Sequence, residues 1–240
     1  MINVYLIGYG AWGKKVFKAL KKIKKINKIF IKKNRKDNKK INLKNIDWVF
    51  VATNINQHYN IAKQYLNKKI NVFCEKPLTQ NLIRDKKLFS LAKQKNCKLY
   101  VSDIENYKKF KLVLKKNNYI SRYKLSNNKN NILERLAYHD FTYICEKFKI
   151  FKIHKVIITS LKKGEISFKL KMKNKYFYFS YSLNSKKNIH SFNKKNLRVK
   201  KNILKIMIED VISEKVDYSK NKKNALFANS AINLIKQSSP

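Results

Sequence analysis

The chain has 240 residues and is 44% hydrophobic, so it can bury a core and fold as one or two domains. Its 4 Gly and 3 Cys exclude a collagen-like chain and a disulfide framework, and the odd cysteine number favours a reducing cytoplasm. The net charge is +43, but the lysines are spread from end to end and only 5 of the 57 basic residues are Arg. Because Arg makes the bidentate contacts that nucleic-acid recognition favours, we expect no specific nucleic-acid partner.

Strand-like and helical patterns alternate in the first half of the chain. Strands are expected at residues 2–7, 29–31, 48–52, 70–74 and 98–102. Helices are expected at residues 12–25, 57–66 and 82–94. This alternation is typical of parallel βαβ units, so residues 1–117 are predicted to form a dinucleotide-binding Rossmann domain.

The pattern changes in residues 118–240, which are predicted to form a smaller α+β domain with a mostly antiparallel sheet. Strands are expected near residues 154–160, 165–172, 175–183 and 189–192, and helices at 132–148, 203–213 and 221–236. The fold class is therefore α/β, with a Rossmann parallel sheet followed by a shortened domain for substrate binding and dimerisation. No apolar run is long enough for a signal sequence or a membrane span, so a soluble, cytoplasmic protein is expected.

A GxGxxG motif lies between the first expected strand and the first expected helix. Gly8 permits a tight turn, Gly10 lets the backbone approach a pyrophosphate, and Gly13 lets the helix pack on the strand. The cofactor-binding residues predicted here are Gly8, Gly10, Ala11, Trp12 and Gly13. A tight strand–helix turn without a ligand is the alternative, but three of the chain's 4 Gly fall in this motif.

The end of the second strand indicates which dinucleotide binds. An NAD-binding domain usually has an acidic residue there to hold the ribose 2′-OH, and this chain has no acid before Asp37. Lys33, Asn34 or Arg35 can accept a 2′-phosphate instead, so NAD and NADP both stay open with a lean to NADP. Any loop of this lysine-rich chain is basic, which is why the lean is slight.

A second candidate site is the Glu75-Lys76-Pro77 run that follows the strand at 70–74. Ligands of open α/β sheets bind beyond the carboxyl ends of the strands, so Lys76 is expected to face the cofactor crevice. A lysine that is partly desolvated beside a nicotinamide can act as a proton acceptor or donor.

The spaced motifs together resemble the glucose–fructose oxidoreductase and inositol dehydrogenase family (Gfo/Idh/MocA). The matching segments are Gly8–Gly13, Val51-Ala52-Thr53 with His58 five residues after the threonine, Cys74-Glu75-Lys76-Pro77-Leu78, and Leu136-Ala137-Tyr138-His139-Asp140. The first and last segments are most similar to members that act on sugar nucleotides. The resemblance covers residues 1–108 continuously and resumes near residue 136.

This resemblance implies an NAD(P)-dependent oxidoreductase that moves hydride to or from a carbon of a sugar or sugar nucleotide. It implies that Lys76 handles the hydroxyl proton and that His139 assists, so these are the predicted catalytic residues. It adds Thr53, Asn54, His58, Glu75 and Lys76 to the cofactor-binding set. A homo-oligomer through the second sheet is also expected, and a metal is not, because His154 and His190 lack ligand spacing.

The chain departs from the family pattern at one chemically important position. The residue four before His139 is Arg135, where the family usually has an acid. Glu134 is adjacent but points about 100° around an α-helix, so it is no simple replacement. An alternative hypothesis is therefore a catalytically impaired, dinucleotide-binding relative with a sensing or assembly role. A polyanion-binding protein on a Rossmann scaffold is the third hypothesis.

Overall fold

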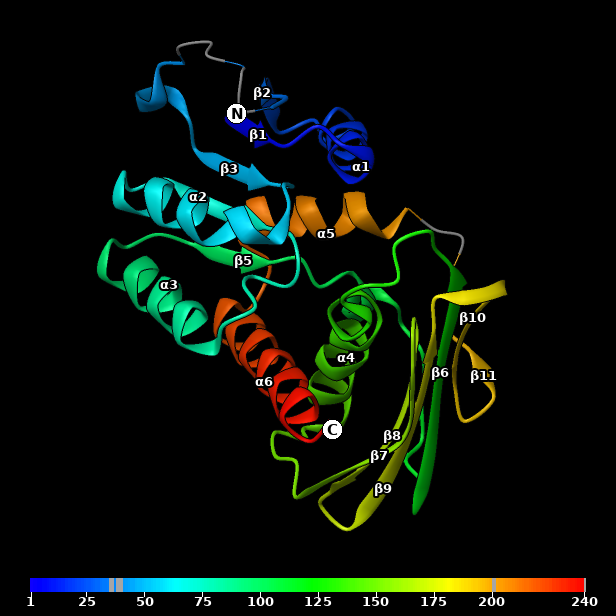
Figure 1. Ribbon diagram of the computed structural model, residues 1–240. Coiled ribbons are helices and arrows are strands. Elements are labelled where there is room, and N and C mark those ends of the chain that lie inside the picture. Colours follow the sequence, from blue (N-terminus) through cyan, green and yellow to red (C-terminus); the bar gives the residue numbers. More distant parts are fainter. Residues whose placement is uncertain (35–36, 38–40, 200–201, 240) are drawn as a thin grey trace. The chain divides into compact units, whose positions relative to one another are not determined.

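The structure is a computed structural model that describes residues 1–34, 37, 41–199 and 202–239 (Figure 1). Contacts divide the chain into two compact units, Met1–Ile104 with Asn202–Leu226 and Glu105–Lys201 with Phe227–Pro240. The predicted split followed chain order and fell after residue 117. The units interleave instead, because helix α5 (Ile203–Ile212) returns to pack on α1 (Ala11–Leu20) of the first unit.

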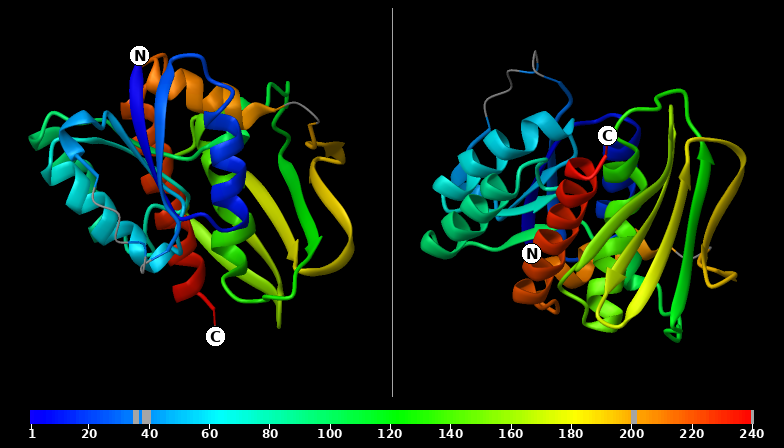
Figure 2. Two further views of the ribbon diagram at one scale, coloured as in Figure 1. Left: turned by 90° about the horizontal axis from the view of Figure 1, so that it is seen from above. Right: turned by 60° about the horizontal axis from the view of Figure 1, so that its bottom comes forward.

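The first unit contains a five-stranded parallel sheet in the order β2-β1-β3-β4-β5. Its strands are β1 (Ile2–Ile7), β2 (Ile26–Lys32), β3 (Trp48–Val51), β4 (Asn71–Cys74) and β5 (Leu99–Val101). Its helices include α2 (Ile55–Asn67) and α3 (Leu82–Gln94), which cover one face, while α1 and α5 cover the other (Figures 1 and 2). A short 3₁₀ helix, η1, spans Leu43–Asn45. The predicted Rossmann sheet is confirmed.

The central strands of this sheet are buried on both faces, as the continuous apolar runs in the sequence predict. The rings of Phe50, Phe73 and Tyr100 stack across three neighbouring strands, with centroids 4.9 and 5.7 Å apart. At the β5 edge, the buried amide of Asn221 pairs with both backbone groups of Val101, each at 2.9 Å. Asn221 lies on α6 (Tyr218–Gln237), which begins in the first unit and continues into the second.

The second unit contains a six-stranded sheet in the order β11-β10-β6-β9-β8-β7. Its strands are β6 (Asn117–Leu125), β7 (Lys155–Lys162), β8 (Glu165–Met172), β9 (Lys175–Ser182), β10 (Asn184–Phe192) and β11 (Lys195–Asn196). The β6–β9 pair is parallel and the other pairs are antiparallel, which confirms a mostly antiparallel sheet. The 3₁₀ helix η2 (Ile104–Tyr107) precedes it, and β6 is a strand that the sequence patterns did not reveal.

Helix α4 (Tyr138–Phe148) covers one face of the second sheet (Figure 2). Phe141 on this helix packs against Phe168, Phe179 and Phe227, with ring centroids 5.4 to 6.4 Å apart. The described part of the chain holds no helix that is both long and apolar enough to cross a membrane.

The helix expected over residues 132–148 is confirmed, and its first part is of the π type. Leu133–Ala137 form a π-helix, in which the N–H of Tyr138 donates to the carbonyl of Leu133, five residues back. The wider turn changes the angular spacing of the side chains before His139, so the α-helical value used for Glu134 does not apply there.

Candidate active site

The glycine-rich turn brings the start of α1 against the ends of β1 and β3. Gly8 has a φ of +98°, and a Cβ there would lie 2.5 Å from the carbonyl oxygen of Ala52. A Cβ on Gly13 would lie 2.0 Å from the carbonyl oxygen of Gly8. Both positions therefore need glycine for the turn itself, as the motif predicts.

Gly10 is different, because a Cβ there would meet nothing within 4 Å. Gly10 is also the N-cap of α1, and no side chain caps the helix. The first N–H groups of a helix without a side-chain cap, together with its dipole, form a binding site for a phosphate. The open space at Gly10 therefore fits the pyrophosphate of a dinucleotide.

We expect Gly10→Ala to weaken dinucleotide binding and Gly13→Ala to lower the stability of the fold. The methyl group at position 10 enters open space, so the fold should persist while dinucleotide affinity falls by at least about tenfold. The methyl group at position 13 meets backbone, so the melting temperature should fall. Thermal unfolding followed by circular dichroism, with nicotinamide fluorescence titration of each variant, measures both effects. Equal affinity of Gly10→Ala and wild type would contradict this use of the turn.

A pocket of about 780 Å³ opens beside this turn, within the first unit. Eight of the predicted cofactor residues line it: Gly8, Gly10, Ala11, Trp12, Lys33, Asn34, Thr53 and Asn54. Polar side chains of α2 complete the wall, namely Asn56, Gln57, Asn60 and Gln64. Arg35, which was also predicted, lies outside the described residues.

The end of β2 supplies the basic part of the pocket wall. Lys32, Lys33 and Asn34 line the pocket there. The carboxylate of Asp37 accepts a hydrogen bond from the backbone N–H of Lys33 at 3.1 Å, so this acid is engaged with the loop backbone.

The end of β4 carries the Glu75-Lys76-Pro77 run. Glu75 is buried, and burial raises the pKa of its carboxyl group, although hydrogen bonds from Trp12 and Ser102 oppose the rise. Lys76 is half-buried and its peptide bond to Pro77 is cis. A carboxyl group with a raised pKa next to a half-buried amine is an arrangement that enzymes use to handle protons.

His58 lies beneath the two loops that follow β3 and β4. Its ring is 2% exposed, with Nδ1 at 3.0 Å from the carbonyl oxygen of Pro77 and Nε2 at 3.1 Å from that of Thr53. Burial lowers the pKa of the imidazole, while the backbone hydrogen bonds oppose that change. The resemblance implies that His58 lies along the cofactor. In the structure its ring lies between the backbone segments of Thr53 and Pro77 and is not among the residues that line the pocket.

His139 belongs to the second unit and lies in the first turn of α4, where it is half-buried. Its carbonyl accepts a hydrogen bond from the hydroxyl of Thr142 at 2.9 Å. Arg135, at the position of the usual acid, donates to the hydroxyl of Ser126 at 2.7 Å and to the carbonyl of Asn128. The buried carboxylate of Glu134 forms an ion pair with Lys236.

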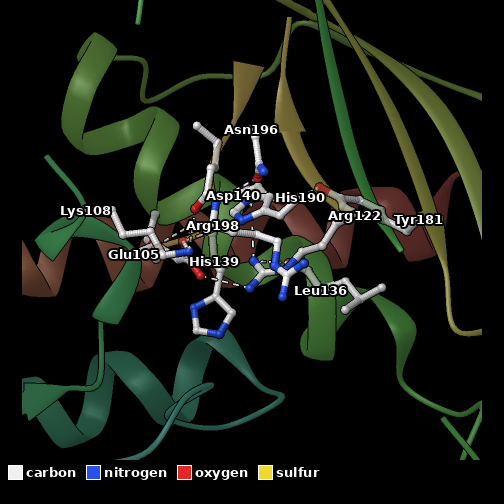
Figure 3. Close-up of polar contacts among 12 residues, drawn as sticks. Glu105, Lys108, Arg122, Leu136, His139, Asp140, Tyr181, His190, Asn196 and Arg198 are labelled. Carbon is white, nitrogen blue, oxygen red and sulfur yellow. Dashed lines mark hydrogen bonds and ion pairs between the residues drawn. The ribbon is translucent and has the colours of Figure 1, made fainter. Parts of the chain in front are cut away.

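A buried ionic cluster connects α4 to the sheet of the second unit (Figure 3). Arg122 donates to Glu105 at 2.9 Å and lies 3.6 Å from Asp140. His190 Nε2 lies 2.8 Å from Asp140 Oδ1, the oxygen that Arg122 also approaches, and the Tyr181 hydroxyl donates to Asp140 Oδ2 at 3.0 Å. The cluster thus holds the residue next to His139, whose imidazole points away from it in Figure 3.

The electrostatics of this cluster favour its charged form. Burial alone would raise the pKa of Asp140, but the charges of His190 and Arg122 lower it below its ordinary value. The pKa of Glu105 is lowered in the same way against burial, by Arg122, His190 and Lys108, whose ammonium lies 2.5 Å away.

Sequence reasoning missed this cluster. His190 was weighed only as a metal ligand, and no group of metal-ligating side chains occurs among the described residues. The one feature of the sequence that pointed to this cluster was Asp140, which directly follows His139 in the Leu136–Asp140 segment.

The parallel sheet, the glycine turn and the pocket define a nucleotide-binding Rossmann fold, and comparisons with known proteins agree. Residues 31–103 match the GFO_IDH_MocA family model, described as an oxidoreductase family with an NAD-binding Rossmann fold. An uncharacterized oxidoreductase of Schizosaccharomyces pombe is 44% identical over 57 residues, which are 24% of this chain and 15% of that protein. The resemblance to the Gfo/Idh/MocA family is therefore confirmed through the nucleotide-binding part.

Solved structures with the same fold extend over the whole chain. A UDP-N-acetylglucosamine 3-dehydrogenase of Acidithiobacillus ferrooxidans aligns with a TM-score of 0.84 at 12% identity, over 99% of this chain and 97% of its own. A myo-inositol dehydrogenase of Corynebacterium glutamicum aligns with a TM-score of 0.77 at 9% identity, over 100% and 96%. At these identities the likeness establishes the fold. The family match over residues 31–103 supports an NAD(P)-dependent oxidoreductase.

Proposed function

We propose that the chain moves hydride between a nicotinamide cofactor and a hydroxyl-bearing or ketone carbon of a sugar or sugar nucleotide. The observation that carries the proposal is the pocket at the glycine turn. There is open space beside Gly10 for a pyrophosphate, and the basic side chains of Lys32 and Lys33 line the pocket as well. Support for the substrate class comes from the motifs that resemble sugar-nucleotide dehydrogenases and from the fold shared with the UDP-N-acetylglucosamine dehydrogenase.

The chain's own residues supply the proton chemistry in this proposal. When bound, the cofactor donates or accepts the hydride. Lys76 Nζ takes the proton of the substrate hydroxyl as the alcohol becomes a ketone, and returns it in the reverse direction. For His139 we propose an assisting role, as a proton partner or by hydrogen-bonding the substrate. Glu75, next to Lys76 in the chain, would lie near the nicotinamide ribose.

Fluorescence titration with NADH and NADPH, at about 50 and about 300 mM salt, tests the cofactor part of the proposal. Saturable binding that persists at the higher salt supports it, and UDP-sugars then follow as candidate substrates. If neither cofactor binds, the oxidoreductase proposal fails. Nucleic-acid binding of sub-micromolar affinity at about 150 mM salt favours the polyanion hypothesis instead.

For the cofactor itself we propose NADP, because Lys32, Lys33 and Asn34 line the pocket where the ribose 2′ position is expected. The Lys33→Ala variant should lose about tenfold in affinity for NADPH, since one charge-assisted hydrogen bond to a phosphate is removed. Its affinity for NADH should change less than about twofold. Titration of both cofactors against wild type measures the ratio, and an equal loss for both would contradict a 2′-phosphate contact.

A second candidate function is a catalytically impaired relative that binds dinucleotide for sensing or assembly. Arg135 favours it, because its guanidinium is tied to Ser126 and Asn128 at the position of the usual acid. Retained cofactor affinity without turnover, unchanged in the Arg135→Asp variant, would support this candidate over the enzyme.

We also propose that the enzyme is cytoplasmic and forms a homo-oligomer through the second sheet. All three cysteines are free thiols, which suits a reducing compartment. Exposed aromatic residues favour the oligomer, since Tyr119 is 54% exposed and stacks on Tyr178. Light scattering of the purified chain measures its mass in solution.

A further inference from the structure

We propose that Arg122 is a positioning residue that fixes the backbone on both sides of His139. It contacts Leu136, three residues before the histidine, and Asp140, directly after it. The inference rests on the proposed function, because it takes His139 as a group that assists at the substrate. All four residues belong to the second unit, with Arg122 on β6 and the other three in the π-helix and the first turn of α4.

The guanidinium of Arg122 has enough donors for its contacts. Nη2 donates to Glu105 Oε1 at 2.9 Å. Nη1 donates to the carbonyl of Leu136 in a long hydrogen bond of 3.5 Å, and it lies 3.6 Å from Asp140 Oδ1. A guanidinium carries five N–H groups, so each contact has its own donor. One side chain therefore ties the π-helix and the first turn of α4 to the anchoring carboxylate of Glu105.

The π-helix is the segment that this contact holds. Leu133–Ala137 run directly into α4, and the N–H of Tyr138 donates to the carbonyl five residues back. Such turns are rare and occur frequently at functional sites. A change of this turn to α geometry would alter the rotation of His139 relative to the residues before it. Leu136 is 1% exposed, so Arg122 holds the turn on its buried side.

Burial and charge make these contacts hard for water to replace. Glu105 and Asp140 are both buried. Burial alone would raise the pKa of Asp140, but His190 and Arg122 lower it, so the carboxylate stays ionised and attracts the guanidinium. The imidazole of His139 points away from this cluster in Figure 3. The cluster therefore acts on the backbone of His139 and not on its ring.

The Arg122→Lys variant removes the fork of contacts and keeps the charge. A lysine ammonium is a compact point charge, so it can pair with a carboxylate but cannot reproduce the planar fork that also reaches Leu136. Tyr123→Phe is the matched control. It changes the next residue of β6 and removes one hydrogen bond, from the Tyr123 hydroxyl to that of Ser180 at 2.9 Å.

The imidazole signals of protein labelled with isotopic histidine, observed by NMR without cofactor or substrate, provide the first readout. The chain has 4 His, and single substitutions assign their signals. In Arg122→Lys we expect the signals of His139 and His190 to move together while the other two stay. Tyr123→Phe should leave the His139 signal in place. A shift of His190 alone in Arg122→Lys would overturn the proposal, because the cluster would then be an ion-pair network without effect on His139.

Cofactor affinity and turnover provide the second readout. In Arg122→Lys, kcat should fall about 10- to 100-fold, because a misplaced assisting group costs this much. The Kd for NADPH should change less than about twofold, since the cofactor pocket lies in the first unit. Tyr123→Phe should keep the wild-type kcat. An Arg122→Lys variant with the wild-type kcat would overturn the proposal.

A second variant keeps the proposal testable if Arg122→Lys does not fold, as judged by circular dichroism. Glu105→Gln keeps the shape of the anchor but offers Nη2 an uncharged and weaker acceptor. The His139 signal should move in this variant as well. A signal at the wild-type position would count against the positioning role.

Failure of the proposed function is distinguishable from failure of this inference. If wild type binds no NADPH, or turns over no sugar nucleotide, the oxidoreductase proposal fails. The His139 signal of the variants then still shows whether Arg122 positions this histidine.

Discussion

Replacement of Lys76 by methionine is expected to lower kcat by about 10²- to 10⁴-fold, the range that general acid–base groups contribute. Methionine has a similar length but carries no proton-accepting group. The cofactor Kd should change less than about tenfold, because the pocket wall at the glycine turn is untouched. Turnover is followed by NADPH absorbance with the sugar nucleotide that the substrate screen identifies.

The Lys76→Arg variant decides which property of the lysine is used. Arginine keeps the positive charge but cannot be deprotonated in a protein, so it should be as slow as methionine if the amine must accept a proton. An arginine variant with more than about a tenth of wild-type kcat would mean that the charge alone suffices. Lys87→Met, on the exposed side of α3, removes a lysine elsewhere and should leave kcat unchanged.

The sequence predicts the bounds of helices and strands well where the buried side chains are apolar and regularly spaced. The helix at 82–94 and the strand at 165–172 have the predicted bounds, because their alternating or helical apolar positions face a core. The glycine turn was also predictable, since its chemistry depends on backbone space that only glycine leaves.

The missed strand β6 shows why the rest was not predictable. Its inward face includes Asn118, Ile120 and Arg122. Two of these residues are polar, so the sequence pattern of this inward face is that of a solvent-exposed face. The Arg122 side chain is only 17% exposed, and the carboxylates of Glu105 and Asp140 that lie against it are remote from it in the chain. Periodicity cannot reveal a pairing of this kind.

The contacts of the His58 ring were hidden for a related reason. The ring nitrogens of His58 lie against backbone carbonyl oxygens, and carbonyls carry no sequence signal. The π-helix before His139 was hidden as well, because an apolar pattern cannot distinguish a π turn from an α turn over five residues.

The buried cluster of the second unit gives the largest expected effect on stability. The Asp140→Asn variant should lose about 3–5 kcal/mol of unfolding free energy near neutral pH, because Arg122 and His190 keep their charges or donors without the carboxylate. Tyr181→Phe removes one hydrogen bond to the same carboxylate and should lose about 1.5–3 kcal/mol. Urea unfolding at matched protein concentration measures both.

A matched charge removal at the surface serves as the control. Glu214 lies 3.6 Å from Lys98, and its side chain is 60% exposed. Glu214→Gln should therefore lose less than about 1 kcal/mol, since exposed pairs are screened by solvent. A loss in Asp140→Asn no larger than in this control would mean that the cluster contributes no net stability.

The pH dependence of the same variant tests the charge of the cluster. The pKa values of Asp140 and Glu105 are lowered in the folded state, so their ionised forms stabilise the fold above the ordinary carboxyl range. This stability is lost as the pH falls through that range toward the lowered folded values. The deficit of Asp140→Asn should thus narrow below about pH 4, where wild type loses its carboxylate as well. A deficit that does not narrow between about pH 4 and about pH 3 would show that Asp140 acts through its shape and hydrogen bonds rather than through its charge.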